Sequence, residues 1–415
     1  MKKIVFIVAN GDKKGHIGNW TTKLCHSIGK KGYNVTVITN KLSPEKYLNV
    51  PPCFKLIELS NGKYAFEKYE NKPESLPYWF AYFRNSWIIP KAAIEFSQKE
   101  KVDAIFISGT EYMTFSLLLR YMRLKQFSIP PIVWGIEAPN FSYGAYPGAL
   151  YKKIFKSLQR RFIKGVFGNE VKTIGTVTEW HKNRLREQLQ LPDLFPIEVY
   201  GDGADEAYIL DKYEAREKLG IKFKGLLFLF LGMIRDDKGI EDFIKATSYL
   251  KDFNMMIMII GWPMHYTVDE LNNIINKYGS PEKIFKRFEY VPENDLPLYY
   301  SACDVVVFPY NKMYTGGTGP LTKGACAYGK PVIITNVSGM FELVKKHKFG
   351  LIAEAQNPYS IAEKMKEFMN LDEAQKMELS KNSLSLGRLC SWDNMAYRVI
   401  EILKKASNSR DNYAQ

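Results

Sequence analysis

A glycine-rich segment is the part of the sequence best suited to binding an anion. Residues 315–319 read TGGTG, and Pro320, which suits the first position of a helix, follows at once. Glycines let the backbone approach a ligand closely, and the amides that begin a helix attract phosphate or hydroxyl groups. The segment is either a ligand-binding loop or an ordinary turn between a strand and a helix.

Two cations at another strand end favour the ligand-binding interpretation. Residues 230–239 read FLGMIRDDKG, which places Arg235 and Lys238 between an apolar run and a helical pattern. The carboxyl ends of parallel strands meet at one edge of a sheet, so we expect both cations beside the glycine-rich loop. Together with helix N-termini they would form a diphosphate site. The alternative is that each cation is merely solvated.

The elements that must position these residues alternate between apolar runs and amphipathic helical patterns. Runs rich in β-branched residues, such as 304–308 and 332–334, are typical of buried parallel strands. The alternation predicts an α/β fold with two doubly wound, Rossmann-like parallel sheets facing each other across a cleft. A turn-rich segment at 199–206, VYGDGADE, suits the hinge between them.

Length and composition limit the partners. The 415 residues are enough for two domains, and the formal net charge of +14 favours nucleic acid, an anionic membrane surface or phosphorylated substrates. No zinc-finger, RNA-recognition or arginine–glycine pattern is present, so nucleic acid is not expected. The five cysteines are widely separated, which predicts neither disulfides nor a zinc site. We expect a cytoplasmic protein.

A basic, aromatic helical pattern at residues 149–167 has two interpretations. Apolar residues recur every three or four positions, and six lysines and arginines lie between them. Such a helix can lie in an anionic membrane interface, so peripheral attachment to the inner face of a membrane is one expectation. The other is that the apolar stripe covers the sheet and the charges are solvated. No apolar run approaches the ~20 residues that span a bilayer.

In chain order, motifs of the second half resemble the retaining GT-B glycosyltransferases of family 4, also called glycosyl transferases group 1. The matching segments are GDGAD at 201–205, the run at 232–239, Gly261 after a strand, VPENDLPLYYSACD at 291–304, ACAYGKP at 325–331 and SW at 391–392. The first half resembles the family only in architecture and in its glycine-bearing first turn.

The resemblance implies three parts. Residues 1–196 would be an acceptor-binding Rossmann-like domain, 197–388 a nucleotide-sugar-binding Rossmann-like domain, and 389–415 a helix that crosses back to the first domain and ends in a flexible tail. The cations matching Arg235 and Lys238 would hold the diphosphate. The donor-binding residues expected are Gly15, Gly18, Gly232, Tyr290, Val291, Thr315, Gly316, Gly317, Thr318, Gly319 and Leu321. The acceptor is expected at His16, Glu111 and Asn140.

The sequence differs from the family at the positions where members contact the donor sugar. Members usually carry two glutamates eight positions apart, and alignment through 325–331 puts Gly316 and Gly324 there. Sugar contacts then fall to backbone amides and threonine hydroxyls of the glycine-rich loop. Met233 stands where many members have an arginine, and Glu137 where they often have a histidine.

We therefore expect a hexosyltransferase that uses a UDP- or GDP-sugar and a glycan or lipid-linked acceptor, with retention and without a metal or other cofactor. Arg235 and Lys238 would stabilise the leaving diphosphate. If the reaction inverts, Glu137 or Glu111 is the candidate base, although either can instead be a buried hydrogen-bonding residue. A catalytically silent subunit that binds nucleotide sugar and a nucleotide-sugar epimerase are the alternatives.

Overall fold

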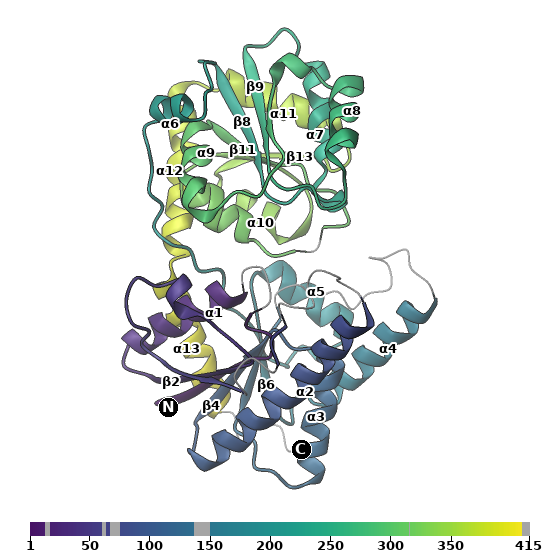
Figure 1. The fold of residues 1–415 in the computed structure, drawn as a ribbon, viewed down its shortest axis with the longest axis vertical. Helices are drawn as coiled ribbons and strands as arrows, with labels where there is room; N and C mark the ends of the chain where they lie inside the picture. The colour runs from purple at the N-terminus through teal and green to yellow at the C-terminus, as the bar shows by residue number, and fades with distance from the viewer. Residues whose placement is uncertain (13–16, 60–63, 67–74, 137–149, 315, 409–415) are drawn as a thin grey trace. The chain divides into compact units, whose positions relative to one another are not determined.

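The structure is a computed structural model that describes residues 1–12, 17–59, 64–66, 75–136, 150–314 and 316–408, with only the backbone described at 150–156. The chain divides into two compact units, one of residues 1–203 with 392–415 and one of residues 204–391. Each unit is a parallel sheet covered by helices (Figure 1).

The first unit contains a seven-stranded parallel sheet ordered β3-β2-β1-β4-β5-β6-β7. Its central strand β1, with the sequence KIVFIV, is buried from its second residue onward, because helices cover both faces. The strands are β1 (Lys3–Val8), β2 (Asn34–Thr39), β3 (Lys55–Glu58), β4 (Ala104–Ser108), β5 (Ile132–Gly135), β6 (Val171–Thr176) and β7 (Ile197–Val199).

Two helical layers cover this sheet. Side chains alternate along β1, so Ile4 and Phe6 join one core and Val5 and Ile7 join the other. The first core contains residues of α1 (Ile17–Lys30) and α13 (Trp392–Asn408). The second contains residues of α2 (Leu76–Lys99), α3 (Tyr112–Leu124), α4 (Leu150–Lys164) and α5 (Glu179–Leu189). The last helix of the chain therefore belongs to the first unit.

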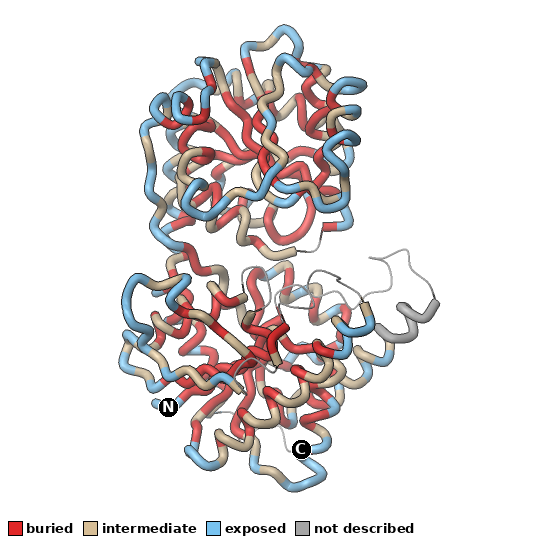
Figure 2. The backbone as a smooth tube through the Cα atoms, viewed as in Figure 1, coloured by how far each residue is buried: buried red, intermediate tan, exposed pale blue. Residues whose placement is uncertain are grey.

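The second unit has a six-stranded parallel sheet ordered β10-β9-β8-β11-β12-β13, and its buried strands form one continuous core (Figure 2). The strands are β8 (Leu226–Leu231), β9 (Met255–Ile260), β10 (Ile284–Arg287), β11 (Val305–Phe308), β12 (Val332–Thr335) and β13 (Gly350–Ala353). The α-helices are α6 (Lys212–Lys218), α7 (Ile240–Ala246), α8 (Val268–Tyr278), α9 (Leu296–Ala302), α10 (Ser338–His347), α11 (Pro358–Asn370) and α12 (Glu373–Leu389).

The predicted boundaries differ from the observed ones in two places. The sequence-based boundary after residue 196 put 197–199 in the second domain, whereas β7 pairs with β6 of the first sheet. The residues FEYV at 288–291 also predict a strand, but the strand lies just before them, as β10, Ile284–Arg287. This edge strand is only half buried and tolerates Lys286 and Arg287, so the more apolar neighbouring residues misled the prediction.

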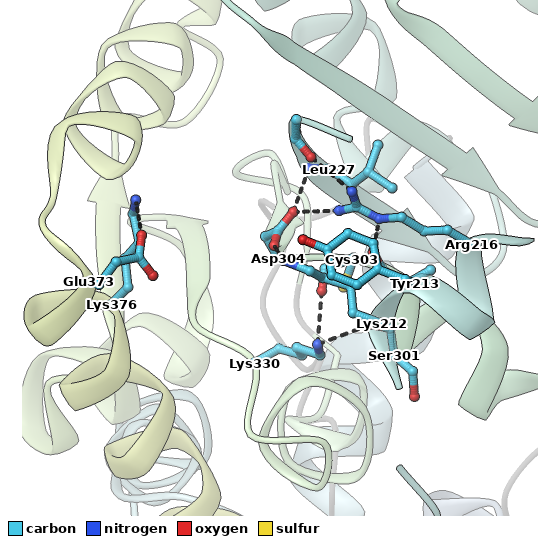
Figure 3. A network of polar contacts seen from close by, with 12 residues as sticks. Lys212, Tyr213, Arg216, Leu227, Ser301, Cys303, Asp304, Lys330, Glu373 and Lys376 are labelled. Atoms are coloured by element: carbon cyan, nitrogen blue, oxygen red, sulfur yellow. Dashed lines mark hydrogen bonds and ion pairs between the residues drawn. The ribbon is translucent and has the colours of Figure 1, made fainter. Parts of the chain in front are cut away.

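A buried ion pair holds the amino-terminal edge of the second sheet (Figure 3). The Asp304 carboxylate accepts hydrogen bonds from Arg216 and from the Leu227 backbone N–H, both at 2.8 Å, and from Lys212 at 3.0 Å. Arg216 is 2% exposed and also donates to the carbonyl oxygen of Ala302 at 3.0 Å. A buried charge is tolerated only when it is paired and hydrogen-bonded in this way.

Both sheets have a switch point, where neighbouring strands have connections that leave in opposite directions. In the first sheet this point lies between β1 and β4, and in the second between β8 and β11. Ligands of doubly wound sheets bind beyond the carboxyl ends of strands at such points. The residues that follow these four strands are therefore the first place to look for a site.

Candidate active site

The loop that follows β8 is packed tightly against the loop that follows β9. Gly232 has a φ of +140°, and a Cβ on Gly261 would lie 1.8 Å from the Gly232 carbonyl oxygen. The Ile234 N–H donates to the Trp262 carbonyl oxygen at 3.0 Å, and the Met264 N–H donates to that of Ile234 at 2.9 Å. Only glycine fits at this contact, which fixes the direction in which the loop after β8 leaves the sheet.

Lys238 is a buried cation that lies over two adjacent aromatic rings, whose centroids are 4.4 Å apart. Its side-chain nitrogen lies 3.8 Å from the ring centroid of Tyr310 and 4.3 Å from that of Tyr314, which both follow β11. Burial, and then repulsion from Arg235, lower the pKa of Lys238 to about 7, while Asp237 opposes the shift. The ring faces attract the cation but cannot neutralise it. A nearby anion would restore its charge.

Arg235 lies in the same loop and is fixed by a neighbour. Its Nε and Nη2 donate to the two carboxylate oxygens of Asp237 at 3.0 and 2.7 Å. Asn311, after β11, donates from its side chain to the Asp236 carbonyl oxygen at 2.6 Å and from its backbone to that of Asp237 at 3.1 Å. The loops on the two sides of the switch point are thus tied together, with Lys238 and the half-buried Arg235 between them.

The described part of the glycine-rich loop borders this pair. A Cβ on Gly317 would meet no atom within 4 Å, and one on Gly319 would meet only Lys323, at 3.9 Å. The Tyr314 hydroxyl donates to the Gly317 carbonyl oxygen at 2.8 Å. Because the same tyrosine ring covers Lys238, the loop is anchored beside the cation. Backbone here faces open space, as a loop that contacts a ligand requires.

The helix after this loop begins at Pro320, as predicted, but it is a π-helix over Pro320–Cys326. The Thr318 carbonyl oxygen accepts hydrogen bonds from the N–H groups of Leu321 and Thr322 and so forms the first turn of the helix. Gly329, predicted just past the helix end, has a left-handed φ of +63°. Leu321 is fully buried in the core, so only its backbone could reach a donor. Short π-helical segments are rare in proteins, and those that occur are often found at functional sites.

Gly316 and Gly324, the glycines expected at the family's glutamate positions, pack against tyrosines. A Cβ on Gly316 would lie 2.7 Å from the ring of Tyr314, and one on Gly324 would lie 2.2 Å from the hydroxyl of Tyr300. Real Cβ contacts are essentially never this short. Any side chain at these positions would therefore displace a buried aromatic residue.

Exposed apolar side chains rim the carboxyl edge of the second sheet. They follow β8, β9, β10 and β11, are 45% to 73% exposed, and comprise Met233, Trp262, Met264, Tyr290 and Met313. Of these, the sequence predicted Tyr290 as a binding residue, while its neighbour Val291 packs against the core. Trp262 was missed, although a tryptophan directly after a strand-end glycine is a readable signal. Aromatic faces of this kind can stack on a nucleobase.

In the first unit, two predicted site residues have structural partners. Gly18 lies in the first turn of α1, where a Cβ would approach Tyr47 and Gly11 to about 3 Å. Glu111 is the N-cap of α3: its carboxylate accepts the N–H groups of Met113 and Thr114 at 3.1 and 2.6 Å. Gln159 of α4 also donates to it at 2.9 Å. These contacts favour the buried hydrogen-bonding interpretation of Glu111. Five further predicted residues lie outside the described ones: Gly15, His16, Glu137, Asn140 and Thr315.

Polar groups at the switch point of the first sheet were not predicted as a site. Asn85 donates to the Tyr64 carbonyl oxygen at 2.9 Å, which fixes its amide orientation, and to the side-chain oxygen of Asn10 at 2.8 Å. Among the described residues, the amide nitrogen of Asn10 has no hydrogen-bond partner, and neither do the hydroxyls of Ser108 and Thr110; all three groups are buried. Val8 and Ser108 pair across β1 and β4, so these groups follow adjacent strand ends.

In the part of the chain that the structure describes, no three His, Cys, Asp or Glu side chains come close enough together to hold a metal ion. No helix there is both long and apolar enough to cross a membrane.

The comparison with known families decides the nature of the second unit. Residues 211–384 match the model described as Glycosyl transferases group 1. This segment is therefore similar to a glycosyl transferases group 1 domain. It contains Arg235, Lys238 and the glycine-rich loop, as the motifs in the sequence predicted.

Curated relatives of the group 1 domain are distant. The D-inositol 3-phosphate glycosyltransferase of Corynebacterium glutamicum (strain R) is 26% identical over 217 residues, which cover 51% of this chain and 50% of the relative. The chain thus spans about half the length of the curated relatives it matches.

Solved structures extend the likeness to the whole chain. A glycosyltransferase from Rickettsia africae has a TM-score of 0.71 at 17% identity and covers 99% of this chain and 100% of its own. Anabaena HepE, solved in complex with UDP, has a TM-score of 0.67 at 15% identity, covering 98% and 100%. At these identities the likeness shows the fold alone, and it confirms the predicted GT-B class with two Rossmann-like domains.

Proposed function

We propose that this protein is a glycosyltransferase that moves a hexosyl unit from a nucleoside diphosphate sugar to a hydroxyl group. The observation that carries the proposal is the position of Arg235 and Lys238 beside open glycine backbone at the switch point of a group 1 domain. Two cations and free amides are the groups that a diphosphate needs. Glycosyltransferase relatives that match about half of the chain support the reaction class.

The assigned roles follow from where charge develops. Departure of the sugar leaves negative charge on the diphosphate, and fixed donors aimed at that charge lower the barrier. Lys238, Arg235 and the backbone amides of Gly317 and Gly319 are the donors we assign. With retention, no strong protein base is needed, and the leaving phosphate takes the proton of the acceptor hydroxyl. Glu111, occupied as a helix cap, is then not required as a base, and no metal is needed.

The nucleobase and the sugar of the donor are held by different groups of the protein. We propose UDP as the carrier, with the uracil against the exposed rim that includes Trp262 and Tyr290; the UDP complex of HepE supports this choice. Gly316 and Gly324 replace the two glutamates typical of this group, and their packing leaves no room for side chains. The sugar hydroxyls are therefore held by backbone and by Thr318.

The acceptor site that we propose is formed by Asn10, Ser108 and Thr110. A buried polar group without a partner costs roughly 1–3 kcal/mol, and hydroxyls of a glycan or lipid-linked acceptor would satisfy all three. Replacing Ser108 with alanine and Thr110 with valine should raise the melting temperature and also raise KM for the acceptor. The matched control is Ser116→Ala, since Ser116 is buried but bonded to Tyr112. A fall in melting temperature for the double variant would contradict this assignment.

One assay tests the function. The purified chain is incubated with a panel of UDP- and GDP-sugars, with and without simple glycoside acceptors, and released nucleotide is measured. Release of one nucleotide, lost in Lys238→Met, is expected, and NMR of the product reads retention or inversion from its anomeric signal. Binding of the panel without release would identify a silent subunit. Interconversion of the sugar while it stays attached to nucleotide would identify an epimerase. We further propose a cytoplasmic location, with peripheral attachment to a membrane through residues 149–167.

A further inference from the structure

The covering layer of α2, α3 and α4 accounts for most of the net positive charge of the protein. These three helices contain eleven basic residues and one acidic residue, Glu95, so they contribute +10 to a net charge of +14. The basic residues are Arg84, Lys91, Lys99, Arg120, Arg123, Lys152, Lys153, Lys156, Arg160, Arg161 and Lys164. The helices pack side by side on one face of the first sheet (Figure 1).

The same layer exposes a stripe of large apolar side chains. On α2 they recur at a spacing of three or four residues, and the stripe continues on α3. The exposed members are Leu76, Trp79, Phe80, Leu117, Tyr121 and Leu124, and the half-buried Phe83 and Trp87 join them; we call these residues the aromatic stripe. Trp79 stacks on Phe83 with ring centroids 5.9 Å apart, and Trp87 lies 5.8 Å from Tyr121 and so joins the two helices.

Exposure is highest at three members of the stripe. Leu76 is 86% exposed, Leu124 83% and Phe80 68%, and Leu76 and Phe80 lie one helical turn apart on α2. Contiguous exposed apolar surface on a protein marks an interaction site. Arg161 and Lys164 of α4, in the same layer of helices, are exposed as well.

We propose that the aromatic stripe inserts into the headgroup region of an anionic phospholipid bilayer while the basic side chains around it contact lipid phosphates. Tryptophan and tyrosine prefer this interface, and lysine and arginine are attracted to an anionic leaflet. A second copy of the chain is the wrong occupant, because two such layers would bring +10 against +10. The proposal deepens the peripheral attachment stated above and rests on it; it adds α2 and α3 as the inserted elements.

The test is cosedimentation of the full chain at low salt, without nucleotide sugar, so its failure leaves the proposed transfer reaction untouched. Vesicles of phosphatidylcholine alone are compared with vesicles of equal parts phosphatidylcholine and phosphatidylglycerol. The protein should partition only onto the anionic vesicles. Replacing Leu76 and Phe80 with serine should weaken this partition on the order of tenfold or more. The matched control is Leu194→Ser, since Leu194 is also 86% exposed but lies outside the layer.

A second pair of variants tests the charge. Arg161→Gln with Lys164→Gln should weaken partition, whereas Lys345→Gln with Lys346→Gln, which changes the net charge equally on exposed residues of the second unit, should not. Absence of binding to anionic vesicles would overturn the proposal, and so would binding that is unchanged when Leu76 and Phe80 are replaced. Reversible dimerisation that is abolished by Phe80→Ser would overturn it too, by making the stripe a protein interface.

Discussion

Replacing Lys238 with methionine should remove a pH dependence from the stability of the second unit. The folded-state pKa of Lys238 is about 7, below its ordinary value of 10.5, because the ammonium is buried beside Arg235. The unfolded chain therefore binds more protons than the folded chain between these values. The cost to folding is fully present below pH 7, shrinks as the pH rises and is lost above 10.5.

The magnitude follows from the size of the shift. One pKa unit corresponds to about 1.4 kcal/mol, so protonated Lys238 costs about 5 kcal/mol at low pH. Between about pH 6 and about pH 9 the wild type should gain about 3 kcal/mol from this group. The variant should gain nothing from it. At about pH 6 the variant should also be the more stable protein, by less than the full cost, because two cation–π contacts are lost.

Calorimetry of both proteins at the two pH values provides the measurement. Other groups titrate in this range, but they are present in both proteins and cancel in the difference. Parallel dependence of stability on pH in the wild type and in Lys238→Met would refute the reasoning.

The pH dependence of nucleotide binding is an independent test of the protonation of Lys238. A diphosphate beside Lys238 favours its charged form, so binding above pH 7 should take up a proton. The affinity for UDP should then fall by up to about tenfold for each pH unit above 7. Isothermal titration in buffers of different ionisation enthalpy counts the protons, and an uptake of zero at about pH 8 would contradict the assigned contact.

Three further outcomes are expected. Asp304→Asn should destabilise the second unit by about 3–5 kcal/mol in denaturant unfolding, because the buried Arg216 loses its charged partner. Gly324→Ala should cost about 1–3 kcal/mol, since its Cβ would collide with Tyr300, and Gly324→Glu should not raise donor turnover. Glu111→Gln should lower stability by about 1 kcal/mol as a weakened helix cap while leaving the pH–rate profile unchanged, and loss of the acidic limb of that profile would instead make Glu111 a base.

The fold was predictable because its strands are central and apolar. β1, β8 and β11 are buried on both faces and are therefore continuous apolar runs in the sequence. Pro320 and Gly329 marked the helix between β11 and β12. Edge strands carry less of this signal. β10 exposes a face to solvent and includes Lys286, which is why the prediction was displaced toward residue 288.

The candidate site was predictable only in part. Arg235 and Lys238 could be placed from their spacing after β8, because parallel topology brings strand ends together. The burial of Lys238 against Tyr310 and Tyr314 could not be predicted, since those tyrosines lie in a loop that is distant in sequence. The unpaired amide of Asn10 could not be predicted either: it depends on how Asn85 of another element is oriented.

The glycines at the glutamate positions and the low pKa of Lys238 belong to one arrangement. Tyr314 fills the space that a side chain at Gly316 would need, and the same ring covers Lys238. A carboxylate at 316 would require that ring to move and would bring a competing anion toward the cation. Glycine avoids both, so Asp237 is the one carboxylate among the described residues that raises the pKa of Lys238, against burial and Arg235. The site therefore has little negative charge near its two cations, and a bound diphosphate would supply that charge.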